Sequence, residues 1–222
     1  MTPHATTTDH TAAPPPVVMG SMCAGSVRCY AMMVRHRHVL IDAAETHLPL
    51  RHSHHRYTIA GPNGPVTLIV PLAAATRAMS TPMAAVKISE HGDWRHRHWG
   101  ALYSAYGRSP YFDFIAADLH RIIVEGRQEL LLDLNMAIHH LIVDFMDLPV
   151  TTTVTTTAGA AVAAGACDLR GRIGGKKGDK LPINDVPYYQ LWASRHGFVP
   201  RLSVLDLLMN EGREGLLKLV KM

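Results

Sequence analysis

HVLIDAA, residues 38–44, is an apolar run that reaches an acidic side chain at Asp42. A short run of this kind, bounded by polar residues, is typical of a strand buried in a sheet. VVMG at residues 17–20 precedes it and predicts a second short strand. Between the two runs, Ser26 is placed to cap a helix that extends to Val34 with apolar side chains on one side. These residues predict a strand–helix–strand unit and an α/β fold.

Two further apolar runs flank a turn-rich linker. RYTIA at residues 56–60 and VTLIV at residues 66–70 lie on either side of GPNGP at residues 61–65. Glycine, proline and asparagine between two such runs are typical of a β-hairpin. VKI at residues 86–88 predicts another short strand, and the β-branched run at residues 151–157 predicts one more.

The middle of the chain is predicted to be helical. From Trp94 onward the apolar period changes from two residues to between three and four, which is the period of an amphipathic helix. Helices are expected at residues 94–107, 111–125 and 127–146. A last helix is expected after Ser203, because serine followed three positions later by an acidic residue is a capping pattern.

The whole pattern predicts a single α/β domain over residues 17–222, preceded by a disordered tail at residues 1–16. In this domain the strand–helix–strand unit and the hairpin contribute a central sheet, and the helical middle section packs on it. A mixed α+β arrangement is the alternative. Hydrophobic residues at 47% and charged residues at 18% are ordinary for globular proteins, which excludes a disordered chain.

Charge and cysteine content exclude several classes of protein. The formal net charge of +4 is spread along the chain, and the longest basic run is the pair Lys176 and Lys177, so no nucleic-acid partner is expected. Three cysteines without CxxC spacing argue against a disulfide framework and a thiolate zinc site. No apolar run approaches the ~20 residues of a membrane span, and the N-terminus has no secretion signal. We expect a cytoplasmic protein without a membrane span.

Histidines are numerous, and they include three His-x-His pairs, at residues 36/38, 52/54 and 96/98. Residues two apart share one face of a strand, so His52 and His54 have metal-binding spacing if their segment is extended. The spacing identifies no third ligand. We therefore predict no metal site and no bound cofactor, and we expect most of the histidines to be exposed or hydrogen-bonded.

His98 differs from the other histidines because Trp94, Trp99 and Tyr106 surround it in sequence. Aromatic neighbours remove water from an imidazole and shift its pKa, which suits acid–base chemistry. The alternative is that this aromatic helix only forms core. We predict His98 as the catalytic residue.

Arg51 and Arg56 flank His54 and His55 immediately before the first hairpin strand. Guanidinium groups bind carboxylates and phosphates through paired hydrogen bonds. We predict that Arg51, His54 and Arg56 contact an anionic small-molecule substrate, and a charged strand edge is the alternative. GRIGGKKGDK at residues 171–180 lacks the register of a nucleotide-binding P-loop.

Gln190, Asp206 and Asn210 form a third polar group toward the C-terminus. Asp206 and Asn210 are four residues apart and share a helix face. We predict that these three side chains position substrate. They are equally suited to holding the helix against its neighbours, and this alternative stays open.

The motifs of the chain resemble the WbqC-like family of bacterial proteins over most of residues 26–217. The resemblance rests on HGDWRHRHWGALYSAYGRSPYF (91–112), LLLDLN (130–135), DLR (168–170) and YYQLWASRHGFVPRLSVLDLLMNEG (188–212). Two segments depart from the family pattern. SMCAG at residues 21–25 stands where many members have a His-Gln-Pro-like strand end and a Leu-Pro-Trp-Leu-Gly-Tyr segment. SHHR at residues 53–56 replaces an Arg-Asn-Arg run, of which Arg56 keeps the last arginine.

The resemblance implies a role in surface-polysaccharide biosynthesis, because genes of the family often lie among genes of such pathways. A glycine or other small acyl transferase role has been suggested for some members. It implies for this chain a transferase that acts on a nucleotide-linked sugar or an activated amino acid. The alternative is a non-catalytic ligand-binding or scaffold protein of the same pathway. The oligomeric state is left open, a homo-oligomer included.

Overall fold

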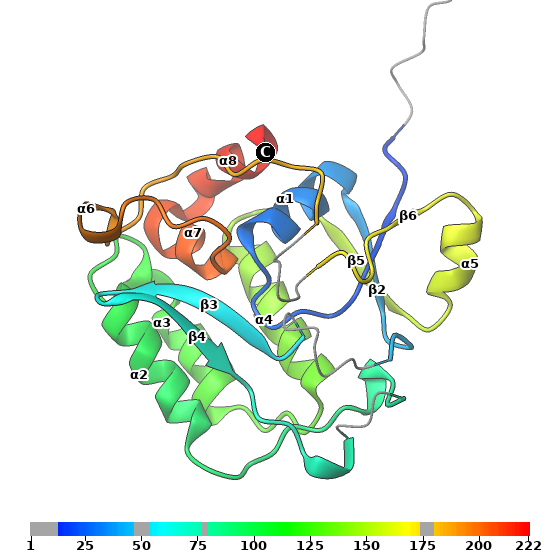
Figure 1. Cartoon of the computed structure of the whole chain (residues 1–222), viewed down its shortest axis with the longest axis horizontal. Coiled ribbons are helices and arrows are strands. Elements are labelled where there is room, and N and C mark those ends of the chain that lie inside the picture. The colour runs from blue at the N-terminus through cyan, green and yellow to red at the C-terminus, as the bar shows by residue number, and fades with distance from the viewer. Residues whose placement is uncertain (1–12, 47–53, 77–79, 174–179) are drawn as a thin grey trace, which may run out of the picture.

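The computed structural model describes residues 13–46, 54–76, 80–173 and 180–222, and it has the mixed α/β architecture expected from the sequence (Figure 1). Its centre is a four-stranded sheet in the order β5-β2-β1-β6. The strands are β1 (Val17–Met19), β2 (His38–Asp42), β5 (Thr151–Thr155) and β6 (Cys167–Asp168). All the strand pairs are parallel, so the four carboxyl ends lie along one edge of the sheet.

The predicted strand–helix–strand unit is confirmed, with α1 (Val27–His36) connecting β1 to β2. The hydroxyl oxygen of Ser26 accepts a hydrogen bond from the Cys29 N–H at 3.3 Å and caps the helix. Almost every residue of α1 is buried, because the helix contacts both β2 and the C-terminal helix α8 (Gly215–Lys221). The unit therefore lies in the core.

The outer strands of the sheet come from a second crossover, from β5 through α5 (Ala158–Ala163) to β6. The sequence indicated no element in this Ala/Gly run. Strand β5 pairs with β2 at one side of the sheet, whereas β6 pairs with β1 at the other side. The strand order therefore reverses between β1 and β6.

The predicted hairpin is confirmed as β3 (Arg56–Gly61) and β4 (Gly64–Ile69), which pair in antiparallel register. Gly64 has φ +108°, a conformation that glycine adopts without strain, at the turn between the two strands. The hairpin forms a separate two-stranded sheet. Helix α2 (Trp94–Tyr106) packs against β3.

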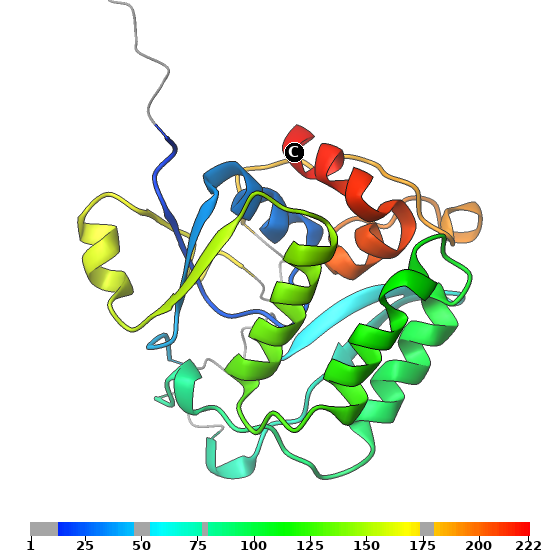
Figure 2. The same cartoon turned by 180° about the vertical axis from the view of Figure 1, so that it is seen from behind.

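The helical middle section continues with α3 (Phe112–His120), a π-helical turn η3 (Arg121–Glu125) and α4 (Leu131–Phe145). Figures 1 and 2 show α4 between the parallel sheet and the pair of helices α2 and α3. The predicted strand at residues 86–88 is wrong, because Lys87 and Ile88 form only isolated bridges. Two short 3₁₀ turns precede these bridges, η1 (Ala74–Thr76) and η2 (Met83–Ala85).

The C-terminal region contains α6 (Ala193–His196), α7 (Val204–Glu211), the 3₁₀ turn η4 (Gly212–Glu214) and α8. Ser203 caps α7 as predicted, accepting from the Leu205 N–H at 3.2 Å. Its hydroxyl also donates to the Ala24 carbonyl at 2.7 Å and so ties α7 to the segment before α1. None of the helices in the described ranges is long and apolar enough to cross a membrane.

Candidate functional site

Polar side chains gather at the carboxyl edge of the parallel sheet. Asp42 ends β2, Asp168 ends β6, and Arg170 follows two residues later. In open parallel sheets, ligands bind in the crevice outside the carboxyl ends of the strands, where the strand order reverses. The reversal here lies between β1 and β6, and Gly20, the residue after β1, lines one pocket together with Arg170.

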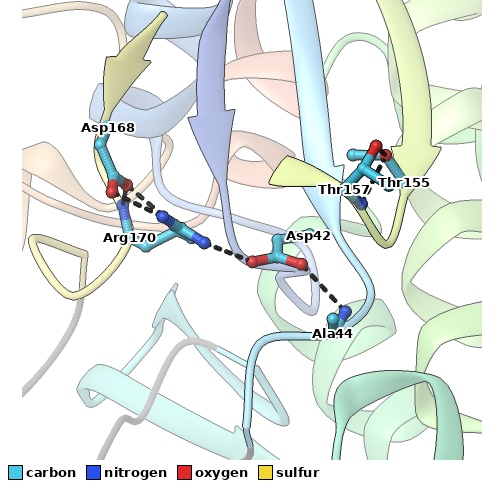
Figure 3. Close-up of polar contacts among 6 residues, drawn as sticks. All are labelled: Asp42, Ala44, Thr155, Thr157, Asp168 and Arg170. Carbon is cyan, nitrogen blue, oxygen red and sulfur yellow. Dashed lines mark hydrogen bonds and ion pairs between the residues drawn. The ribbon is translucent and has the colours of Figure 1, made fainter. Parts of the chain in front are cut away.

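Arg170 joins the ends of β2 and β6 (Figure 3). Its Nε and Nη2 donate to the two carboxylate oxygens of Asp168 at 3.0 and 2.8 Å, and its Nη1 donates to Oδ2 of Asp42 at 2.6 Å. Oδ1 of Asp42 accepts from the Ala44 N–H at 2.9 Å. Hydrogen bonding to Arg170 lowers the pKa of Asp168, so this carboxylate is ionised at neutral pH. We call Asp42, Asp168 and Arg170 the Arg170 cluster.

An open pocket of about 510 Å³, the wide pocket, adjoins the Arg170 cluster. Beside the cluster, its lining is formed by Ala44, Glu45, Thr46, Thr156, Ala158 and Gly159. Three carboxyl groups face one guanidinium among the described residues of this lining, which favours ligand groups that donate hydrogen bonds, such as hydroxyls and amines. In the described part of the chain, no three His, Cys, Asp or Glu side chains are grouped to hold a metal ion.

A second, narrow pocket shares Glu45 and Arg170 with the wide pocket, and Gly20, Met22 and His54 also line it. Gly20 has no room for a side chain. A Cβ at this position would collide with the Glu45 carboxylate and lie 2.8 Å from Cε1 of His54. Glycine therefore allows both side chains to approach the end of β1.

His54 is held in the narrow pocket by hydrogen bonds to its ring and to its backbone. The residue is 3% exposed, and its Nδ1 lies 2.6 Å from the carbonyl oxygen of Ser21. A carbonyl only accepts hydrogen bonds, so Nδ1 carries a hydrogen, which fixes the tautomer of the uncharged ring. Asn135 of α4 donates to the His54 carbonyl and to Oγ of Ser21, each at 2.8 Å. The ring and its backbone are thus fixed from two sides.

The other two members of the predicted anion-binding group are Arg51 and Arg56. Arg51 and His52 lie outside the described residues. Arg56 begins β3 and is partly buried, and its Nε is buried without a hydrogen-bond partner in the described part of the chain. The structure places His54 at the carboxyl edge, and an anion contact of Arg51, His54 or Arg56 stays a prediction.

His98 lies in the core between α2 and the hairpin. Its Nε2 donates to the Ile69 carbonyl at 3.1 Å, and its Nδ1 accepts from the Tyr57 hydroxyl at 3.2 Å. The Trp94 ring packs edge-on against it, with 5.1 Å between the ring centroids. Burial lowers the pKa of His98 to about 4, so the ring is neutral at pH 7. Both nitrogens hold α2 to the hairpin, and this geometry favours a structural role; the catalytic role of His98 stays a prediction.

Asp206 lies in the core on α7. Its two carboxylate oxygens accept hydrogen bonds from the hydroxyls of Tyr106 and Tyr188, each at 2.8 Å. Burial raises the pKa of Asp206 to about 6, although the two hydroxyls oppose this shift. The residue is 1% exposed. The carboxylate thereby joins α2, the segment around Tyr188 and α7.

Gln190 and Asn210 are also engaged within the protein. The Gln190 amide donates to the Val199 carbonyl and accepts from the Val199 N–H, each at 2.9 Å. Nδ2 of Asn210 donates to the Asp206 carbonyl at 2.7 Å, and Oδ1 accepts from the Leu191 N–H at 3.2 Å. These contacts favour the alternative in which the C-terminal group holds α7 in place, and substrate contact by these side chains stays a prediction.

No role for Asp42, Asp168 or Arg170 was predicted from the sequence, although signals were present. Asp42 lies in the apolar run at residues 38–44, and DLR at residues 168–170 is a family motif. The missing information was strand β6. Asp42 and Arg170 are 128 positions apart, and the pairing of β6 with β1 brings them together.

Comparison with known proteins agrees with the motifs. A model of the WbqC-like protein family matches residues 36–169, a span that contains Asp42, His54 and Asp168. Searches of curated proteins and of solved structures found no match to the chain. The family match covers more than half of the 222 residues. The chain belongs to the WbqC-like protein family.

Proposed function

We propose that this protein is a transferase of bacterial surface-polysaccharide biosynthesis that moves a group between small molecules at the carboxyl edge of its parallel sheet. The observation that carries the proposal is His54, a buried imidazole with a fixed tautomer in a pocket at the reversal of the strand order. Histidine suits proton transfer near neutral pH. The pathway is proposed from the family, whose genes often lie among those for surface polysaccharides.

The wide pocket has room for a small-molecule substrate, whereas the narrow pocket beside it has a volume of only about 10 Å³. Hydroxyl or amine groups of an acceptor are proposed to bind in the wide pocket, where Asp42, Glu45 and Asp168 provide oxygens. The donor is proposed to be a nucleotide-linked sugar or an activated amino acid. Its anionic part is assigned to Arg56, two residues beyond His54, whose Nε is buried without a partner among the described residues.

In the proposed step, the acceptor oxygen or nitrogen attacks the activated carbon of the donor. A new C–O or C–N bond forms while the bond to the leaving group breaks, and the leaving group departs with the electron pair. The proton of the acceptor passes to the imidazole of His54, which then returns it to the leaving group or to water. Arg170 remains ion-paired and keeps the ends of β2 and β6 together.

The first test is ligand binding, measured as the shift in melting temperature across nucleotide-linked sugars, amino-sugar nucleotides and aminoacyl donors. We expect one class to raise the melting temperature of the wild-type protein. Gly20→Ala should remove the shift, because the added Cβ displaces Glu45 and His54. The matched control is Gly100→Ala, since Gly100 of α2 has open space around its Cα.

The second test is turnover, measured by mass spectrometry with each stabilising donor and a set of amino-sugar and hydroxyl acceptors. Product formation supports the transferase. Stabilisation by a ligand without product from any donor and acceptor pair would contradict it and would identify a ligand-binding protein of the pathway. If none of these ligands raises the melting temperature, the proposal of a ligand site at the carboxyl edge is contradicted.

A further inference from the structure

A small cavity lies next to the loop that follows β1. Its volume is about 10 Å³, close to the ~10–15 Å³ that one water molecule requires on this measure. Ser21, Tyr30, Asn135 and His139 line it, together with apolar side chains such as Met33. Polar side chains around a water-sized cavity are the usual surroundings of buried water.

Asn135 provides an acceptor at this cavity. The residue is 1% exposed, and the two hydrogens of Nδ2 are used by Ser21 Oγ and the His54 carbonyl. Oδ1 is buried and has no hydrogen-bond partner among the described residues. Turning the amide over would place Oδ1 against the His54 carbonyl, which only accepts, so the orientation is fixed. A buried carbonyl oxygen without a donor is unfavourable.

Ser21 and Tyr30 provide the remaining partners. Oγ of Ser21 accepts from Asn135, so its own hydrogen is available to donate. The Tyr30 hydroxyl lies 3.0 Å from Nδ1 of His139, and Nε2 of His139 lies 2.8 Å from Oγ1 of Thr152. If Tyr30 donates to His139, His139 donates to Thr152 and the Tyr30 oxygen keeps a lone pair for a further donor.

We propose that one water molecule binds in this cavity, accepting from Ser21 and donating to Oδ1 of Asn135 and to the Tyr30 oxygen. Each polar group in the chain from Ser21 to Thr152 then has a partner, and the loop after β1 is joined to α1, α4 and β5. The carbonyl of the same Ser21 fixes the tautomer of His54. Asn135 and the water therefore act as positioning groups for His54, a role that rests on the proposed function.

The test uses NMR on the full chain. Wild-type protein should show NOEs between a long-lived water and the hydroxyls of Ser21 and Tyr30, and ¹⁵N shifts of His54 should report a single tautomer with hydrogen on Nδ1. Asn135→Leu removes both donors and the acceptor, so it should lose the NOEs and give mixed His54 tautomers. Asn210→Leu is the matched control, a buried asparagine on α7 whose replacement should change neither signal.

Three outcomes would each overturn part or all of the inference. Wild-type protein without the water NOEs, or Asn135→Leu that retains them, removes the water site. A single His54 tautomer in Asn135→Leu removes the positioning role. If Asn135→Leu fails to fold, Tyr30→Phe takes its place, because it removes one acceptor and should weaken the NOEs. None of these signals depends on turnover, so the water site and the proposed function fail separately.

Discussion

Arg170 forms ion pairs with two carboxylates that differ in their exposure to solvent. The side chain of Asp42 is 4% exposed and that of Asp168 is 34% exposed. A buried carboxylate that loses its cation is strongly destabilising, whereas an exposed ion pair contributes little. The Asp42 contact is therefore the part of the Arg170 cluster that matters for stability.

Arg170→Met should lower the free energy of unfolding by about 3 kcal/mol, because it leaves the Asp42 carboxylate buried without a cation. Urea denaturation checks this value. Arg121→Met is the control, since Arg121 pairs with Asp118 at the surface and its loss should cost less than about 1 kcal/mol. Adding Asp42→Asn to Arg170→Met should recover part of the loss. Equal effects at Arg170 and Arg121 would show that the cluster is not a buried contact.

The lowered pKa of His98 predicts that the stability of the fold depends on pH. Its folded pKa of about 4 is below the ordinary 6.5, so the unfolded chain takes up this proton first as the pH falls. The stabilisation is complete above about pH 6.5 and is lost as the pH falls toward 4. The difference in unfolding free energy between wild type and His98→Gln should therefore shrink by up to about 3 kcal/mol over this range. A difference that is constant with pH would show that His98 is not buried as a neutral ring.

Helix α7 (Val204–Glu211) is fixed to the rest of the fold at its N-cap residue, Ser203. The hydroxyl of Ser203 accepts from Leu205 and donates to Ala24, and the Ser203 N–H donates to Thr58 in the hairpin. The cap therefore joins three parts of the chain that are distant in sequence. A cap with this many partners should contribute more than an isolated one.

Ser203→Ala should lower the free energy of unfolding by about 2 kcal/mol, because the Leu205 N–H and the Ala24 carbonyl both lose a partner. Thermal or urea unfolding checks the value. Ser104→Ala is the control, an exposed position on α2 where the change should stay within about 0.5 kcal/mol. A cost at Ser203 no larger than at Ser104 would contradict the capping role.

Elements with strong local signals were predictable, and elements that depend on distant partners were not. β2 has an apolar run in its own sequence, and α7 follows a capping pattern that starts at Ser203. β6 has two residues, and its ladder consists of bonds to the β1 segment, such as Cys167 N–H to Pro16 at 2.8 Å. Its sequence alone has no strand signal, so β6 was missed, and the carboxyl-edge site was missed with it.

The arrangement of the whole molecule decides which histidine lies at a pocket and which lies in the core. His98 and His54 are both buried, but His98 lies in the core between α2 and the hairpin, whereas His54 lines a pocket at the sheet edge. The sequence grouped His54 with Arg51 and Arg56, its neighbours along the chain. In space it lies against Gly20 and is held by Asn135, contacts that only the folded chain creates.

Several properties of the whole chain stay predictions of the sequence. These are a single domain over residues 17–222, a cytoplasmic location, an anionic substrate, the expectation of no nucleic-acid partner and no cofactor, and the question of a homo-oligomer. The family and the α/β architecture are established by the family match and by the fold.

The most direct test of a site at the strand-order reversal is the turnover number of His54→Gln, with the donor and acceptor that give product in the wild-type protein. The account predicts a loss of about 100-fold or more with ligand binding retained, because the glutamine cannot take up the proton. His96→Gln, at an exposed histidine of α2, is the control and should turn over like wild type. Full turnover by His54→Gln, together with loss of turnover in folded His98→Gln, would contradict the account.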